Sequence, residues 1–444
     1  MTDHRSQASH SSQAHPASQA INPLERARLR AEAQGRLRSL ISSNFRQAGL
    51  SMPESLYREV GAAAATLRSG GGLPQSGRGP DFSRAAVAEW LTRDGLPTSP
   101  DSLVLTSGSS ISYFLLFRAL REQTSSHLAG PTSSDSPGTV AIPRPGYPLF
   151  EQIASHAGLR TVEYALDLSA GGEPDLSSVQ SLLQSARPPL GLLLISPSNP
   201  TGAITSAETL EALHHLCAQS GTVIISDEVF SAYRPAGSRL PRPARTASDA
   251  SEAPAASPAV ARPGSLAQDV LVVTINGLSK LCAAPELKAG WMAVHGPDAR
   301  VHALLEDLDT AHDAYLTLSA HSAAALQIML SQAAAAARTD IADTVRHMRG
   351  SFYEARTESR REVDWLSPLV TEGGIHIAAR IDSGFAPELD DEQLAIRLLE
   401  DTGLYVHPGY LYGFPDDERW WVMSCLMQPD ELASAMAALR RWQP

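Results

Sequence analysis

The sequence predicts an α/β protein whose largely parallel sheet is covered by helices on both faces. From about residue 102 to about residue 315, short continuous apolar stretches alternate with amphipathic helical stretches. This alternation is typical of strands that are buried on both faces and joined by helical crossovers. The chain has 444 residues, more than a single core usually accommodates, so two domains are expected.

The predicted elements follow the hydrophobic pattern along the chain. Strands are expected where apolar residues run continuously, at 102–107, 138–143, 191–196, 221–226 and 270–275. Helices are expected where the pattern has a helical period, at 23–40, 53–67, 82–91 and 207–219 and over a long stretch from residue 302. After residue 339 come a helix of about 20 residues, strands at 373–381 and 420–426, and a helix at 429–442. These last segments break the alternation and predict a second, smaller α+β domain.

Three segments rich in small and polar residues interrupt this pattern. Residues 1–22 are expected to be a disordered tail, and 125–138 and 235–265 to be surface insertions. Their Ala, Pro and Ser content offers too little apolar surface to order them. The predicted domains are a large one at 75–315 and a small one assembled from 23–74 and 316–444.

The composition argues against several classes of protein. Asp and Glu (48) outnumber Lys and Arg (36), and the net charge of −12 disfavours nucleic-acid binding. No run of about 18 apolar residues occurs, so no membrane span is expected. Cys217, Cys282 and Cys425 lack the spacing of a metal or redox motif, which favours a reducing, cytoplasmic compartment and no metal site. The N-terminal tail lacks the apolar core of a secretory signal, although its Ser-rich, acid-poor composition leaves a transit peptide open.

Two motifs in the first half of the α/β region could contact a planar phosphate ester. Gly108, Ser109 and Ser110 lead from a predicted strand into a helix, whose N-terminal N–H groups favour a phosphate. Serines are also ordinary helix caps, so this turn alone is a weak signal. Tyr147, between two prolines, can present its ring to a flat aromatic ligand, or it can simply pack.

Three further motifs each follow a predicted strand. Asn199, in SNPTG, can donate to a phenolic oxygen, and Asp227, in SDEVF, can pair with a protonated pyridine nitrogen. Lys280, in NGLSK, can form an imine, and the neighbouring Ser279 and Lys288 can bind phosphate. Taken singly, these are also an Asn-Pro turn, a solvated carboxylate and a surface lysine.

The ordered set predicts pyridoxal 5′-phosphate (PLP) as the cofactor. A helix-start Ser, a stacking Tyr, an Asn, an Asp and a Lys occur in this order, each at a strand end in one α/β region. They suit the phosphate, ring, phenolic oxygen, ring nitrogen and aldehyde of PLP. The coincidence of all five carries the prediction, since none of them decides it alone.

These motifs resemble those of the class I/II aminotransferases, PLP enzymes of fold type I that include aspartate aminotransferase. The resemblance covers roughly residues 40–444, and SNPTG, DEVF and LSK are its most specific pieces. It implies a mostly parallel, seven-stranded sheet in the large domain and a homodimer with active sites at the subunit interface. It also implies that Lys280 holds PLP as a Schiff base and moves a proton, that Asp227, Asn199 and Tyr147 hold the ring, and that the phosphate is held by Ser109, Ser110, Ser279 and Lys288.

Four positions depart from the family's pattern. Phe230 stands where most members have a Tyr that binds the phenolic oxygen, and Tyr233 is a candidate substitute. Lys288 replaces an Arg and offers a point charge in place of a fork. The loop at 72–82 lacks the usual tyrosine that reaches the neighbouring subunit's phosphate. Val422 occupies the position of the Arg that grips the substrate α-carboxylate in the family.

The last departure leaves two substrate classes open. An α-amino acid would need another cation for its carboxylate, and Arg46, Arg380 and Arg419 are the candidates. Alternatively, the substrate is an amine or amino alcohol without an α-carboxylate. We favour the amino acid.

The function predicted is that of an aminotransferase, which moves an amino group from an amino acid or amine to a 2-oxo acid. A PLP-dependent lyase or oxidase would use the same core residues, because the fold does not fix the reaction. A non-catalytic PLP-binding sensor is a third possibility. The retained Lys280, Asp227 and Asn199 disfavour it, as does the short segment before the core, which we expect to hold no DNA-binding domain.

Overall fold

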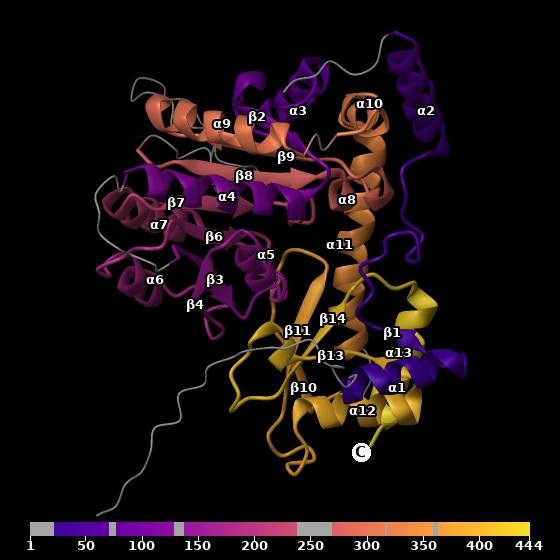
Figure 1. Ribbon diagram of the computed structural model, residues 1–444. Helices are drawn as coiled ribbons and strands as arrows, with labels where there is room; N and C mark the ends of the chain where they lie inside the picture. Colours follow the sequence, from indigo (N-terminus) through magenta and orange to yellow (C-terminus); the bar gives the residue numbers. More distant parts are fainter. Residues whose placement is uncertain (1–21, 71–76, 128–136, 238–268, 316–317, 358–362) are drawn as a thin grey trace, which may run out of the picture.

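A computed structural model describes residues 22–70, 77–127, 137–237, 269–315, 318–357 and 363–444 (Figure 1). The predicted tail and most of the two predicted insertions lie outside these residues. Two bodies of structure are evident in Figure 1, a large sheet covered by helices and a smaller sheet below it.

The large sheet has eight strands in the order β2-β9-β8-β7-β6-β3-β4-β5. The strands from β8 to β4 are parallel, whereas β9 is antiparallel to both of its neighbours and β5 is antiparallel to β4. The prediction of a mostly parallel sheet is confirmed, and the two-residue β5 adds an edge strand to the seven expected. The bounds are β2 (Leu103–Thr106), β3 (Thr139–Arg144), β4 (Arg160–Asp167), β5 (Glu173–Pro174), β6 (Gly191–Ile195), β7 (Val223–Asp227), β8 (Val272–Gly277) and β9 (Gly290–His295).

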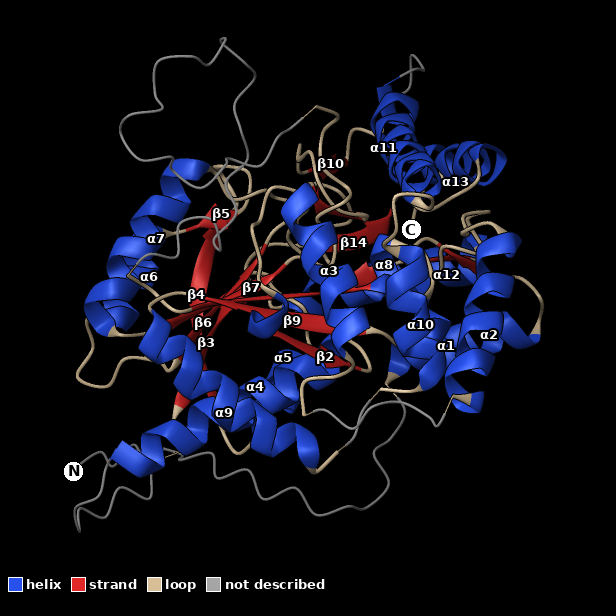
Figure 2. Ribbon diagram, turned by 90° about the horizontal axis from the view of Figure 1, so that it is seen from above, coloured by secondary structure: helices blue, strands red, loops and turns tan. Residues whose placement is uncertain are grey.

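Helices cover both faces of this sheet, as the continuous apolar strands require (Figure 2). Successive side chains of β6 alternate between two cores: Leu193 packs with α4, α5 and α9, and Leu194 packs with α6 and α7. The bounds of these helices are α4 (Ser109–His127), α5 (Phe150–His156), α6 (Leu176–Leu183), α7 (Ala207–Ser220) and α9 (Asp298–Asp313).

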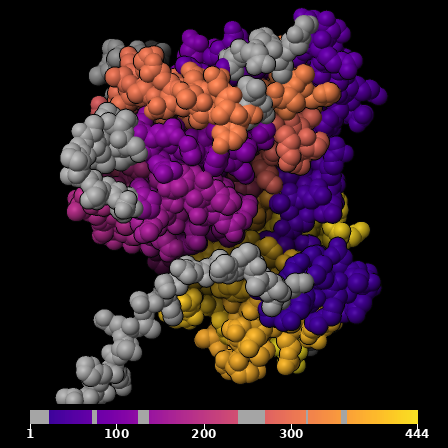
Figure 3. All heavy atoms as spheres, in the orientation of Figure 1, coloured from indigo at the N-terminus to yellow at the C-terminus, as the bar shows by residue number. Residues whose placement is uncertain are grey.

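The smaller body is built on an antiparallel sheet in the order β10-β11-β14-β13. A separate parallel pair, β1 with β12, joins the start of the chain to this region, and in Figure 3 the N-terminal segments run along one side of the molecule down to it. The strands are β1 (Arg38–Ser39), β10 (Leu366–Pro368), β11 (His376–Ile381), β12 (Leu404–Tyr405), β13 (His407–Pro408) and β14 (Trp420–Ser424). The helices are α1 (Pro23–Ala33), α11 (Ala335–Thr357), α12 (Asp391–Thr402) and α13 (Pro429–Arg441).

The remaining helices lie beside the large sheet. Helix α2 (Glu54–Ser69) packs against α10 (Ala320–Met329), which in turn packs against α3 (Asp81–Arg93), and the short α8 (Leu278–Leu281) follows β8. We expected 53–67 and 316 onward to belong to the small domain. Because α2 packs on α10, α10 on α3 and α3 on β2 beside the large sheet (Figure 1), we propose instead that the small domain comprises the chain up to about residue 52 and from α11 onward. Among the described residues, no helix is both long and apolar enough to span a bilayer.

One glycine fixes the joint between α12 and the β1–β12 pair. Gly403 ends α12 with a φ of 77°, and its carbonyl accepts a hydrogen bond from the Arg38 N–H at 2.8 Å. A Cβ at this position would lie 2.2 Å from the Arg36 carbonyl oxygen. Gly35, just after α1, has a similar φ of 67°, but a Cβ there would meet nothing within 4 Å.

These two glycines provide a matched test of the joint. We expect Gly35→Ala to lower the free energy of unfolding by about 1 kcal/mol, the cost of a left-handed backbone for a residue with a Cβ. Gly403→Ala should cost about 3 kcal/mol, because the Arg36 backbone must also move. Urea unfolding of both variants measures the difference, and equal losses would show that the close approach to Arg36 contributes nothing.

Candidate active site

A pocket opens where the strands of the large sheet end, facing the small sheet. It encloses about 720 Å³ of empty space, part of it open to solvent. Six predicted site residues line it, arriving after β2, β3, β6, β7 and β8, as expected when parallel strands end at one edge. The lining residues are Ser43, Ser109, Ser110, Tyr113, Tyr147, Phe150, Ile153, Ile195, Asn199, Asp227, Val229, Phe230, Lys280 and His376.

Asp227 is a buried carboxylate that pairs with no cation among the described residues. It is the last residue of β7, a central strand, and only 6% of it is exposed. One carboxylate oxygen accepts from the Val229 N–H at 2.9 Å, and the other accepts from the Tyr113 hydroxyl. Burial raises the pKa of this carboxyl from 3.8 to about 6. A protonated ring nitrogen would supply the missing positive charge, so the residue fits the cofactor that the motifs predict.

Lys280 also lines the pocket, from the single turn of α8 that follows β8. Burial lowers the pKa of its amine, which increases the fraction present as the unprotonated nucleophile. Its Nζ lies 5.6 Å from the centroid of the Phe45 ring. Lys280 and Lys288 are the only lysines in the 444-residue sequence. Because arginine stays protonated in proteins, an amine able to form an imine must come from a residue of this type.

The start of α4 offers a cradle for a phosphate. Gly108 has a φ of 122° immediately before the helix, and Ser109 and Ser110 of its first turn line the pocket. A Cβ on Gly290 would come within 3.0 Å of the Gly108 Cα, so β9 and this turn are in close contact. The N–H groups at the start of a 19-residue helix, with no acidic side chain in its first turn, suit an anion.

Asn199 and Tyr147 complete the predicted ring contacts. The Oδ1 atom of Asn199 is buried without a hydrogen-bond partner among the described residues, so this amide is available to a ligand. Tyr147 is half-buried and meets Phe150 edge to face, with ring centroids 5.4 Å apart. Both residues line the pocket beside Asp227.

Two predicted phosphate contacts do not line the pocket. Ser279 is half-buried next to Lys280 but lies outside the lining, and Lys288 is exposed, with a φ of 45° after a short 3-10 helix (Pro285–Leu287). Their predicted role in holding the phosphate stays a prediction.

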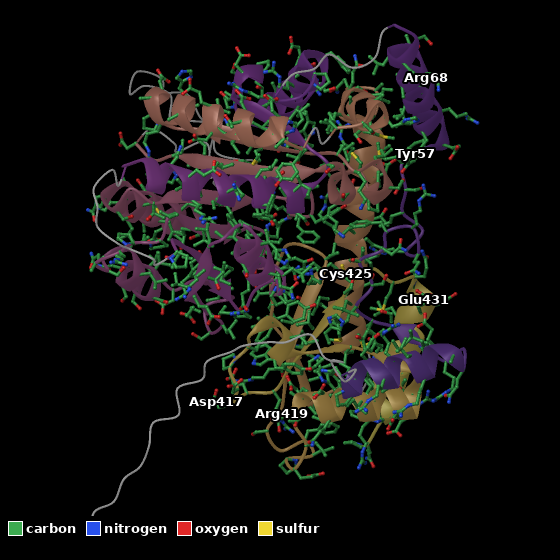
Figure 4. The ribbon with its side chains drawn as sticks, viewed as in Figure 1. Tyr57, Arg68, Asp417, Arg419, Cys425 and Glu431 are labelled. Carbon is green, nitrogen blue, oxygen red and sulfur yellow. The ribbon has the colours of Figure 1, made fainter. Side chains whose placement is uncertain are left out.

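The three arginines proposed for the substrate carboxylate are engaged elsewhere. Arg46 is exposed, pairs with Glu286 at 3.3 Å and lies over the Tyr57 ring. Arg380 points outward from β11 to Glu418 at 3.4 Å. Arg419 donates to backbone carbonyls, including those of Ala386 and Leu389 at 2.9 Å, and Figure 4 shows it low in the molecule near Asp417. None of the three lines the pocket. The contacts of this chain therefore give no support to the expectation that one of them faces a substrate there.

Two other sequence departures also have a structural outcome. Val422 is fully buried in β14 among Ala378, Tyr412, Phe414 and Trp420, so that position presents no cation. Tyr233 is buried, and its hydroxyl donates to the backbone carbonyl of Lys280. It therefore does not replace the hydroxyl that Phe230 lacks.

Sequence reasoning missed several lining residues, of which Ser43, Tyr113 and His376 are polar. Tyr113 lies one helical turn after Ser109 on α4, a spacing that could have revealed it. His376 begins β11 of the small sheet, and only its position after two glycines in an apolar strand marks it. Burial, and secondarily the charge of Lys280, lower the pKa of His376 from 6.5 to about 3. Among the described residues, no group of three or more His, Cys, Asp or Glu side chains is arranged to hold a metal ion.

Comparison with known families gives a match over most of the chain. The family model described as aminotransferase class I and II matches residues 54–439. An alanine aminotransferase of Mycobacterium tuberculosis is 26% identical over 422 residues, covering 94% of this chain and 88% of the relative. A valine–pyruvate aminotransferase of the same organism is 31% identical over 201 residues, 45% of this chain and 47% of its own.

Solved structures share the fold. An alanine aminotransferase from Pyrococcus furiosus superimposes with a TM-score of 0.77 at 19% identity, covering 96% of this chain and 99% of its own. An aspartate aminotransferase from Thermus thermophilus with maleate gives a TM-score of 0.71 at 21% identity, covering 95% and 96%. The architecture is therefore that of fold type I.

The raised pKa of Asp227 leads to a test with a defined sign. Without cofactor, the folded protein should lose stability as the pH rises from about 4 to about 6. In this range the unfolded carboxyl ionises, whereas the buried one keeps its proton until about pH 6. At pH 7, Asp227→Asn should therefore raise the free energy of unfolding of the cofactor-free protein, on the order of 1–3 kcal/mol. The gain should shrink as the pH falls toward 5, which urea titrations at several pH values would measure.

The same substitution should weaken PLP binding at least tenfold, about 1.4 kcal/mol, because an amide cannot neutralise a protonated ring nitrogen. Asp416→Asn, at an exposed position, serves as the control and should change neither the free energy of unfolding nor PLP binding. A cofactor-free Asp227→Asn protein that is less stable than the parent at pH 7 would contradict the account of the buried carboxylate.

Proposed function

The chain belongs to the class I and II aminotransferases, which depend on PLP, and we propose that Lys280 is the residue through which it transfers amino groups. The observation that carries this proposal is that one pocket is lined by both a half-buried amine of lowered pKa and a buried carboxylate of raised pKa. When bound, PLP supplies an aldehyde that condenses with amines and a ring that withdraws electrons from them.

The six predicted site residues that line the pocket, together with Tyr113 and Gly108, each have a task in this proposal. The Lys280 amine takes a proton from the substrate carbon and returns it, a role for which a lowered pKa is suited. Asp227 holds the ring nitrogen in its cationic form, and Tyr113 fixes the carboxylate by donating to it. Asn199 and Tyr147 hold the ring. Gly108, Ser109, Ser110 and the start of α4 hold the phosphate.

The family transfers amino groups between amino acids and 2-oxo acids, and we propose that this chain prefers amino donors with small apolar side chains. Phe150, Ile153, Ile195 and Val229 line the pocket, and Lys280 is the single cationic residue of the described lining. The second carboxylate of an acidic donor would be buried without a partner there, which is unfavourable. The alanine and valine named for two relatives fit this preference.

We also propose that the enzyme is a cytoplasmic homodimer. The three cysteines are buried free thiols, as expected in a reducing compartment. The homodimer rests on the family resemblance, and a light-scattering mass of the purified protein would test it.

Because the chain has only two lysines, the residue to which PLP attaches can be identified directly. Borohydride should fix PLP covalently to the native protein, and peptide mass mapping should find it on Lys280. An absorbance band near ~420 nm, expected of a PLP imine, should disappear in Lys280→Ala and persist in Lys288→Ala. Label on Lys288 or on the chain's amino terminus alone would refute the role of Lys280.

Donor preference is the second test of this function. We expect kcat/KM for alanine or valine to exceed that for aspartate by about 100-fold, which corresponds to about 2.7 kcal/mol for an unpaired buried carboxylate. Formation of the new amino acid from pyruvate, followed by chromatography, measures transfer. Release of ammonia with no amino acid formed would instead indicate a lyase or an oxidase on the same scaffold.

A further inference from the structure

His376 is a pocket residue whose polar edge has no partner within the protein. It is 6% exposed, and its Nδ1 atom is buried with no hydrogen bond to any described residue. Buried polar atoms are normally paired, so the unpaired ring is unusual. Because Nδ1 is closed off from solvent, the nitrogen that a pocket ligand can meet is Nε2, which also has no hydrogen bond to a described residue. No task in the proposed mechanism has so far used this side chain.

The position of the imidazole is constrained by its backbone and by one aromatic contact. Its backbone is fixed by pairing with Ser424 of β14 and by the Arg349 guanidinium, which donates to the His376 carbonyl at 2.8 Å. The ring stands perpendicular to Phe230, with centroids 5.5 Å apart. The side chain is therefore pre-positioned, which lowers the entropic cost of binding a ligand.

The other candidates for a substrate carboxylate are committed or absent. Lys280 is needed as the reacting amine, and Ser109 and Ser110 lie at the phosphate cradle. Arg349 is the nearby buried cation, but its guanidinium donates to the Thr371 carbonyl and hydroxyl as well as to His376, and it does not line the pocket. Ser43 also lines the pocket, but it is exposed, so His376 is the buried lining residue that offers an N–H and has no other assigned task.

We propose that the His376 imidazole donates an N–H hydrogen bond to the α-carboxylate of the amino donor and of the 2-oxo acid, so that an uncharged ring does the work of a cation. This inference rests on the proposed function, because it assumes that amino acids enter this pocket. A neutral imidazole has one donor and one acceptor nitrogen, and a bound carboxylate favours the tautomer whose N–H faces it. The burial that keeps the ring uncharged also removes water that would compete for this bond.

Propionate is a suitable probe, because it carries a carboxylate but no amine and cannot react with the cofactor. In the PLP-loaded protein, we expect propionate to shift the ring ¹⁵N and ¹H resonances assigned to His376. His376→Phe should weaken propionate binding at least tenfold by calorimetry and raise the KM for alanine by a similar factor, with kcat changed less than about threefold. His376→Gln, which keeps an N–H donor, should recover part of both losses.

His407 provides the matched control, since it is another largely buried imidazole of the same sheet, lies opposite Val422 and is absent from the pocket lining. His407→Phe should leave propionate binding unchanged. Unaltered propionate binding in a folded His376→Phe protein that keeps its ~420 nm band would overturn the proposal. So would a wild-type protein that reacts with ethylamine but does not bind propionate. Loss of the PLP band from the wild type would defeat the proposed function itself, which separates the two failures.

Discussion

The structure of the site follows from one constraint: a carboxylate is buried at the end of a central strand, and no described residue supplies a cation to neutralise it. Asp227 is held by the Val229 N–H and the Tyr113 hydroxyl, which position it but do not cancel its charge. The same burial acts in opposite senses on the two ionisable groups of the site, raising the pKa of Asp227 and lowering that of Lys280. Both groups are thus driven toward their neutral forms until a cationic ring and an aldehyde occupy the space between them. Cofactor binding and folding should therefore be coupled.

The part of the fold that sequence predicted well is the part whose strands are buried on both faces. Continuous apolar runs marked β6, β7 and β8, because every side chain in them meets a helix layer. β4 was not predicted, since its burial alternates along an outer strand, and β5 has only two residues. β9 was not predicted either, although it is buried along nearly its whole length. The position of α2 was also missed. A helical period shows which face of α2 is apolar, but it does not show that this face packs on α10, more than 250 residues later in the chain.

The site was predictable to a similar extent and for a related reason. Asp227, Asn199 and Lys280 each follow a strand directly, so local order along the chain places them at one edge of the sheet. His376 reaches the same pocket from the small sheet, through pairing between β11 and β14 that no local pattern encodes. The arginines were poor predictions because a charge in the sequence does not show where the side chain points. Arg419 donates to backbone carbonyls, and Arg380 pairs with Glu418.

The distribution of lysine and arginine supports the proposed roles of Lys280 and His376. In a chain with 36 basic Lys and Arg residues, only two are lysines, and one of them lies in the pocket. Arginine elsewhere serves structure, as in Arg349, whose fork satisfies carbonyls of the small sheet. A lysine at position 280 is required where an amine must lose its proton and react, a task closed to a guanidinium. A sequence so rich in arginine nevertheless places none in the described pocket lining, where an arginine could have gripped a carboxylate. Within the described lining of this chain, a carboxylate meets uncharged donors, and His376 is a buried one whose ring has no hydrogen-bond partner among the described residues.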